Sequence, residues 1–208
     1  MTSWRQRGRE AWAERLHSGG VATGLAGGLA AYLELLGRWG AAVDLLGQID
    51  DEELLTGHVL ESLAALPWVG ATGTLLDVGS GNGFPAVPLL LGSPGLRGVL
   101  LEPRERRWAF LRELVRELGV PAEVVRERVS DHAAPGSGYS VATVRGVKIG
   151  AWLPHAGRLL RPDGTWLWWT SAANAAELGR RVPEGRVLTF PLPDPARGNL
   201  VVWRRCST

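Results

Sequence analysis

The residues most suited to chemistry follow an apolar segment near the middle of the chain. Residues 75–84 read LLDVGSGNGF, so the carboxylate of Asp77 is followed by glycines at positions 79, 81 and 83. Glycines let the backbone turn sharply and let a ligand approach it, and N–H groups of a following helix can bind polar atoms. A second carboxylate, Glu102, ends the next apolar segment, 19 residues beyond Gly83. An acid at that place can accept hydrogen bonds from both hydroxyls of a ribose, which predicts a ribose-bearing ligand.

The spacing of the glycines separates two kinds of ribose-bearing cofactor. Dinucleotide-binding proteins carry G-x-G-x-x-G, whereas this chain carries G-x-G-x-G with Asp77 two residues ahead. S-adenosylmethionine has cationic sulfonium and amino groups, so Asp77 is tolerated where a pyrophosphate would be repelled. The pattern resembles motif I of class I methyltransferases and predicts this cofactor. Its predicted contacts from the motif are Asp77, Gly79, Gly81, Gly83 and Glu102. A nicotinamide cofactor and a structural turn without a ligand remain as alternatives.

Short apolar segments that alternate with helical ones would position these residues. Strands are predicted at residues 74–78, 98–101, 122–125, 140–144, 165–169, 186–190 and 199–204. The clearest helix covers residues 105–118, because its apolar residues from Trp108 to Leu118 share one face and Gly119 supplies a C-cap. Such alternation predicts an α/β, Rossmann-like fold, and together with the resemblance to motif I it implies the class I methyltransferase fold. Its mainly parallel twisted sheet would be closed by an antiparallel C-terminal hairpin.

Helices are predicted before this region. Residues 3–17 have the pattern of an amphipathic helix with a basic face, which is either solvated or in contact with RNA. A second helix is predicted over Thr23–Trp39, and a third begins near Asp50 and ends at Pro67. We expect two parts in the chain, an N-terminal helical extension over residues 1–68 and a cofactor-binding domain over residues 69–208.

The composition is that of an ordinary soluble globular protein, with 45% hydrophobic and 21% charged residues. The uncharged stretch of residues 19–33 is too short and too rich in glycine for a membrane span, so we expect a buried helical layer there. Cys206 is the single cysteine, and no Cys/His cluster has metal-ligand spacing. These features predict a cytoplasmic protein without a structural metal.

Arginine supplies nearly all of the positive charge, and Lys148 is the only lysine. Clusters occur at Arg104, Arg106 and Arg107 and at positions 126 and 128. Guanidinium groups bind phosphate bidentately and stack on bases, which suits RNA. Codon bias in a GC-rich genome explains the same composition, and on charge alone it is the preferred explanation.

Four segments carry a more specific pattern. They are GHVLESL at residues 57–63, DVGSGNGFPAVP at 77–88, EPRERRWAFL at 102–111, and Arg145 after the fourth strand. Together they resemble the bacterial 16S rRNA guanine-N7 methyltransferase family, also called glucose-inhibited division protein B, over about residues 29–204. The G-F-P-x-x-P continuation is the most specific part, because generic methyltransferases rarely carry it. The resemblance implies an enzyme that methylates N7 of one guanine in small-subunit rRNA or the 30S particle. We expect a monomer that needs neither membrane nor metal.

The resemblance also assigns roles to residues. The cofactor contacts would be Gly79, Ser80, Gly81 and Phe84 at the methionine part, Glu102 at the ribose, and Val129 and Ser130 at the adenine. Arg145 would lie beside the methyl group and the target base, as the catalytic residue and a further cofactor contact. The predicted RNA contacts are His58, Arg104, Arg107 and Lys148.

Some interpretations stay open at this point. Without the resemblance, a surface ion pair would be favoured for Arg145, and a helix-surface pair with Glu61 is favoured for His58. Relatives tend to have a lysine where this chain reads WWTSA at 168–172, and Gly146-Val-Lys148 replaces small apolar residues. A small-molecule methyltransferase and a catalytically silent ribosome-binding assembly factor therefore remain as alternative functions.

Overall fold

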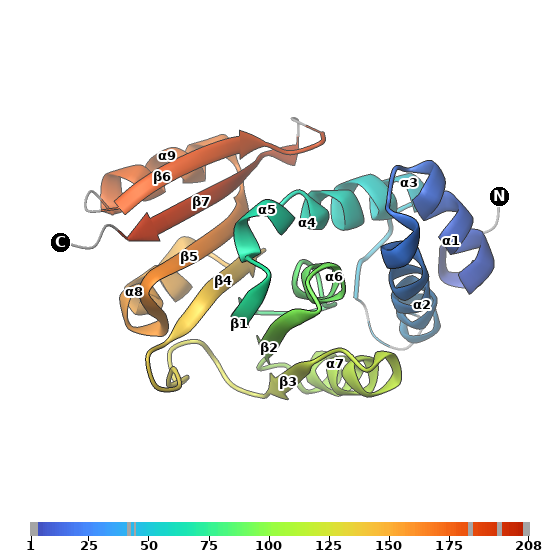
Figure 1. The fold of residues 1–208 in the computed structure, drawn as a ribbon, viewed down its shortest axis with the longest axis horizontal. Coiled ribbons are helices and arrows are strands. Elements are labelled where there is room, and N and C mark those ends of the chain that lie inside the picture. Colours follow the sequence, from blue (N-terminus) through green and yellow to red (C-terminus); the bar gives the residue numbers. More distant parts are fainter. Residues whose placement is uncertain (1–3, 41–42, 44, 183–184, 195–196, 206–208) are drawn as a thin grey trace.

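Seven strands form a single sheet in the order β3-β2-β1-β4-β5-β7-β6 (Figure 1). The computed structural model describes residues 4–40, 43, 45–182, 185–194 and 197–205, so Cys206 lies outside the described residues. The first five strands pair in parallel, while β7 is antiparallel to both β5 and β6. The strands are β1 Thr72–Val78, β2 Gly95–Leu101, β3 Ala122–Val125, β4 Tyr139–Arg145, β5 Leu160–Thr170, β6 Gly185–Pro191 and β7 Asn199–Arg205. The predicted α/β sheet and its closing antiparallel hairpin are confirmed.

Helices cover both faces of this sheet (Figure 1). Alternate strand residues point to opposite faces, so Leu75 joins a cluster with α2, α6 and α7, and Leu76 joins a cluster with α8 and α9. The helices are α1 Arg9–Ser18, α2 Thr23–Trp39, α3 Asp51–Leu54, α4 Glu61–Leu63, α5 Leu66–Val69, α6 Ala86–Gly92, α7 Glu105–Leu118, α8 Ile149–Leu159 and α9 Ala172–Arg181. The predicted bounds of α2 and α7 are confirmed, and Gly119 caps α7 in the left-handed conformation.

The predicted helix over residues 3–17 is wrong in its continuity. A 3₁₀ turn, η1 (Trp4–Gln6), precedes α1, and the extended backbone of Gly8 separates the two. Trp4 and Trp12 are both buried in the core that α2 also enters. The basic side chains are occupied within the chain, with the ion pairs Arg7–Asp51, Arg9–Glu34 and Arg15–Glu52. This face is therefore held by acidic partners, and RNA contact through these three arginines is not supported.

The third helical region also differs from its prediction. The side chain of Asp50 caps the start by accepting a hydrogen bond from the N–H of Glu53, at 2.7 Å. A π-helical turn, η2 (Leu55–Leu60), then separates α3 from α4, and the helical run already ends at Leu63. Pro67 does not end it but lies in the first turn of α5, where a missing N–H costs nothing.

The helical N-terminal part packs onto the sheet domain. One hydrophobic cluster contains Leu29 and Leu33 of α2 together with Leu89 of α6 and Phe110 of α7. The buried helical layer predicted for residues 19–33 is confirmed for Ala26 and for residues 29–33 of α2, whereas residues 19–22 precede the helix and residues 22–24 are exposed. Among the described residues, no helix combines the length and apolar character needed to cross a membrane.

Candidate active site

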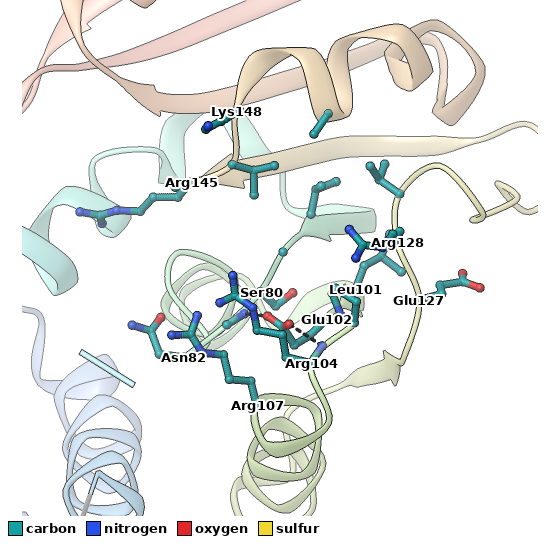
Figure 2. A pocket seen from close by; sticks show the side chains of 18 of the residues that line it. Ser80, Asn82, Leu101, Glu102, Arg104, Arg107, Glu127, Arg128, Arg145 and Lys148 are labelled. Atoms are coloured by element: carbon teal, nitrogen blue, oxygen red, sulfur yellow. Dashed lines mark hydrogen bonds between the residues drawn. The ribbon is translucent and has the colours of Figure 1, made fainter. Parts of the chain in front are cut away.

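The site lies where the strand order reverses. β1 and β4 are neighbours, and the connection after β1 leads to β2 on one side while the connection after β4 leads to β5 on the other, which opens a crevice at their carboxyl ends. A pocket of about 800 Å³ fills this crevice. Figure 2 shows Arg145 and Lys148 on one side of it and Ser80, Glu102, Arg104 and Arg107 on the other.

The glycine turn forms the floor of the pocket. After β1 the N–H groups of Gly79 and Ser80 both donate to the carbonyl of Leu101, at 2.9 Å, which ties the turn to the end of β2. Gly79, Gly81 and Gly83 have φ values of +74°, +54° and +101°, a region that side-chain-bearing residues rarely adopt. A Cβ on Gly79 would also lie 2.7 Å from a methyl group of Val147. The motif therefore needs glycine for both its turn and its close approach.

Glu102 is a buried carboxylate held by main-chain groups. It is 3% exposed and accepts hydrogen bonds from the N–H of Gly81 at 3.0 Å and of Arg104 at 2.8 Å. Each carboxylate oxygen keeps lone pairs for further donors. Its fixed orientation in the pocket suits two neighbouring hydroxyl groups, as a ribose presents.

Asp77 lies beneath the turn and does not line the pocket. It is 1% exposed; Thr143 donates to one carboxylate oxygen at 2.6 Å, and the other has no partner among the described residues. Burial raises the pKa of Asp77 to about 7, against the opposing hydrogen bond from Thr143. A buried carboxylate with an unsatisfied oxygen fits a cationic ligand overhead, and it would disfavour a phosphate.

The far end of the pocket is formed by the loop after β3. Val129 is buried and Ser130 is exposed, and both line the pocket. Arg158 of α8 fixes this loop by donating to the carbonyls of Val129 and Ser130, at 2.9 and 3.0 Å. Val129 offers an apolar wall, and the Ser130 hydroxyl, which donates to Asp131 at 3.0 Å, can still accept a hydrogen bond, so the loop suits a purine ring.

Arg145 extends from the end of β4 into a network of charges. One of its terminal nitrogens donates to the carbonyl of Gly57 at 2.7 Å and to Glu61 at 2.6 Å. Arg197, from the β6–β7 connection, also binds Glu61, at 2.8 Å, and reaches Glu53 at 3.0 Å. We call Glu53, Glu61, Arg145 and Arg197 the ionic network. The other terminal nitrogen of Arg145 is buried without a partner in the described chain.

The ionic network corrects two interpretations. Glu61 is 1% exposed and Arg145 is 18% exposed, so their ion pair is buried and not a surface pair. Glu61 does not pair with His58 on a helix surface; its carboxylate binds the two arginines instead. The π-helical turn carries the carbonyl of Gly57 to Arg145. A Cβ on Gly57 would lie 2.5 Å from the Arg197 guanidinium carbon, so a side chain there would displace Arg197.

His58 lines the pocket and packs on Phe84, with ring centroids 5.2 Å apart. Burial, reinforced by the charges of Arg145 and Arg197, lowers the pKa of His58 to about 3. The imidazole is therefore neutral near pH 7. Its Nδ1 is buried and has no hydrogen-bond partner within the described residues.

Most of the predicted site residues converge on the pocket. Those that line it are His58, Gly79, Ser80, Gly81, Phe84, Glu102, Arg104, Arg107, Val129, Ser130, Arg145 and Lys148. Gly83 supports the turn from outside: its N–H donates to the carbonyl of Ser80 at 2.7 Å. Thr143 and Arg197 were missed, because nothing in the sequence near them marks their long-range partners. Asn82 was missed although it stands inside the motif and lines the pocket.

A Rossmann-like sheet with a G-x-G-x-G turn after β1 and a carboxylate after β2 defines the class of S-adenosylmethionine-dependent methyltransferases. The residues fit that cofactor, since Asp77, directly before the turn, is buried with one unsatisfied carboxylate oxygen and Glu102 is fixed for a ribose. Residues 27–184 match the family described as rRNA small subunit methyltransferase G, and the chain belongs to that family.

Relatives with the name ribosomal RNA small subunit methyltransferase G support this assignment. The chain is 38% identical to one from Stenotrophomonas maltophilia (strain K279a) over 73% of this chain and 72% of the relative. It is 32% identical to one from Xanthomonas campestris pv. campestris (strain 8004), over 85% of each.

Solved structures confirm the fold. A SAM-dependent methyltransferase from Aquifex aeolicus has a TM-score of 0.59 at 17% identity, covering 74% of this chain and 93% of that one. A Burkholderia thailandensis 1,6-didemethyltoxoflavin-N1-methyltransferase with bound S-adenosylhomocysteine has a TM-score of 0.56 at 19% identity, covering 86% and 89%.

Proposed function

We propose that this chain transfers a methyl group from S-adenosylmethionine to N7 of a guanine in small-subunit rRNA. The observation that carries the proposal is its membership of the rRNA small subunit methyltransferase G family over residues 27–184, with Arg145 at the pocket. The relatives are named for this RNA, and the arginine-lined mouth of the pocket suits a polyanion.

The proposed cofactor contacts follow the lining of the pocket. Gly79, Ser80, Gly81 and Phe84 would border the methionine part, Glu102 the ribose, and Val129 and Ser130 the adenine. Asp77, beneath the turn, would stabilise the positive charge of the cofactor. The cofactor supplies an electrophilic methyl group on a sulfonium.

Methylation at N7 depends on positioning the base against the methyl group and needs no proton transfer to activate N7. Guanine N7 has an in-plane lone pair, so its attack on a methyl group needs no general base. Arg145 would hold O6 or a neighbouring phosphate, because a donor placed on N7 itself would block the nucleophile. Its partnerless terminal nitrogen is suited to that acceptor.

The charge around the base is balanced for this reaction. Positive charge develops on guanine as the methyl group arrives. His58 stays neutral near pH 7 and adds no charge, while the buried carboxylate of Glu61 offsets Arg145. His58, Arg104, Arg107 and Lys148 would contact the RNA, with the base unstacked from its neighbours.

Methyl mapping tests the proposal. The purified protein is incubated with methyl-labelled S-adenosylmethionine and 30S particles or 16S rRNA from cells that lack the modification, and the labelled nucleotide is located. We expect label at N7 of one guanine, and its loss in Arg145→Ala. Bound adenosylhomocysteine without label on the RNA would contradict the proposal. It would favour a catalytically silent assembly factor, or a small-molecule methyltransferase if free nucleotides or metabolites were methylated.

A further inference from the structure

A second hollow lies beside the active site, between α2 and the start of α7. Its volume is about 690 Å³. It is lined by Trp39, Val43, Glu105, Arg106 and Ala109, together with Arg104 and Arg107. Arg104 and Arg107 also line the cofactor pocket. An extended ligand that leaves the pocket mouth past these two side chains therefore enters the hollow directly.

The charge of the hollow contrasts with the rest of the helical cover. Arg7, Arg9 and Arg15 are each occupied by an acidic side chain. Arg104 and Arg106 are exposed, and within the described residues their guanidinium groups have no acidic partner. Among the described residues that line the hollow, Glu105 is the single acid, and it binds Arg126 at 3.2 Å. Within the part of the chain that the structure describes, the hollow thus presents positive charge on Arg104 and Arg106 that no acidic side chain neutralises.

An aromatic side chain completes the hollow. Trp39, at the end of α2, is half-buried and is fixed by an edge contact with Phe110 of α7, with ring centroids 5.7 Å apart. Guanidinium groups bind phosphate, and a rigid aromatic ring stacks on an unpaired base. The two chemistries together match one unit of single-stranded RNA, and a volume of this order is sufficient for a nucleotide.

We propose that the hollow binds a nucleotide that flanks the target guanine, with its phosphate on Arg104 and Arg106 and its base against Trp39. This inference rests on the proposed function, since it assumes an RNA substrate. It adds a subsite outside the cofactor pocket, so that the enzyme reads more of the RNA than the base it modifies.

Arg106→Gln tests the phosphate contact, because Arg106 lines the hollow and not the cofactor pocket. Arg112→Gln is the matched control: it removes the same charge from an exposed position of α7 outside the hollow. We expect Arg106→Gln to raise the KM for 30S particles by roughly tenfold. The plot of log association constant against log salt concentration should become less steep, its slope decreasing in magnitude by about 1. The Kd for adenosylhomocysteine should not change, and Arg112→Gln should match the wild type.

Trp39 tests the stacking contact independently. Trp39→Leu should weaken binding of protein-free 16S rRNA by roughly tenfold, and Trp39→Phe should restore most of it, because an aromatic face remains. Thermal unfolding and adenosylhomocysteine binding show whether each variant is folded; if Trp39→Leu is not, the Arg106→Gln comparison decides alone.

Three results would overturn the subsite. If wild-type protein methylates rRNA and Arg106→Gln behaves as Arg112→Gln does, the hollow holds no nucleotide although the proposed function stands. If Arg106→Gln weakens binding to 30S particles but not to protein-free rRNA, the hollow contacts a ribosomal protein instead. Wild-type protein that neither binds nor methylates rRNA would remove the proposed function and the subsite together.

Discussion

The two sides of the active-site pocket are held in different ways. On the cofactor side, which comprises Asp77, the turn of residues 79–83 and Glu102, the Glu102 carboxylate binds main-chain N–H groups 21 and 2 residues away. On the base side, Arg145 binds Gly57 and Glu61, which lie 88 and 84 residues away. Glu61 in turn binds Arg197, 136 residues distant. The cofactor side is built mainly by one motif and the strand that follows it, with Thr143 as a distant partner of Asp77, whereas the base side is built by three segments that meet only in the fold.

This difference predicts that substitutions on the two sides of the pocket will have different effects. Changes on the cofactor side should reduce cofactor affinity, because few other elements depend on those carboxylates. Changes in the ionic network should reduce stability first, because the network joins the N-terminal helices, β4 and the β6–β7 connection.

Glu61→Gln should have the largest effect on stability. The side chain is 1% exposed between two guanidinium groups, and its loss leaves buried positive charge uncompensated. We expect the free energy of unfolding to fall by roughly 3 kcal/mol. Urea unfolding followed by circular dichroism measures this change. Glu113→Gln, which removes the partner of the exposed Arg116, should leave the transition near its wild-type midpoint; equal losses in both variants would disprove a buried network.

Glu102→Gln should weaken adenosylhomocysteine binding by roughly 100-fold, because two charge-assisted hydrogen bonds to ribose hydroxyls lose their charge. Calorimetric titration gives the Kd. Glu123→Gln, at an exposed position of β3, serves as the control. A Glu102→Gln protein with wild-type affinity would show that the ribose binds elsewhere.

Asp77 should make cofactor binding depend on pH. Its pKa of about 7 in the folded protein lies above the ordinary value of 3.8. The stability that this raised pKa contributes is complete below about pH 4 and is lost as pH rises through 7, where the buried group ionises. A cationic ligand favours the ionised form, so S-adenosylmethionine affinity should rise roughly tenfold per pH unit below 7 and level off above it. Asp77→Asn should remove this dependence; a parallel pH profile in both proteins would refute it.

Arg197→Gln should have the smallest effect, about 1 kcal/mol of stability, because its side chain is 29% exposed and Glu61 retains Arg145. The double variant with Glu61→Gln should lose less than the sum of the single losses, since the two residues share one interaction. Additive losses would mean that Arg197 acts independently of Glu61.

The difference between short-range and long-range contacts also explains which features could be predicted from the sequence. The glycine turn, Glu102, α2 and α7 were predicted because their signals lie within one short segment of the chain. The partners of Arg7, Arg9 and Arg15 lie 44, 25 and 37 residues away, so a face that looked basic in the sequence is paired in the fold.

The ionic network was also not predictable from local sequence, because residues expected at the surface are buried by distant partners. His58 and Glu61 have helix-surface spacing, yet a π-helical turn and the arrival of Arg197 bury Glu61. Nothing in the sequence near these residues indicates either the π-helical turn or the contact between Arg197 and Glu61. The resemblance to a family placed Arg145 at the pocket, while its buried partners became visible only in three dimensions.

The most direct test of the division between the two sides uses Arg145→Gln. Adenosylhomocysteine affinity is measured by calorimetry, and methyl transfer to 30S particles is followed in a single turnover. We predict a wild-type Kd and a transfer rate lowered by roughly 100-fold or more, because the base loses its holding group while the cofactor keeps its carboxylates. Parallel loss of cofactor affinity, or transfer at the wild-type rate, would contradict the account.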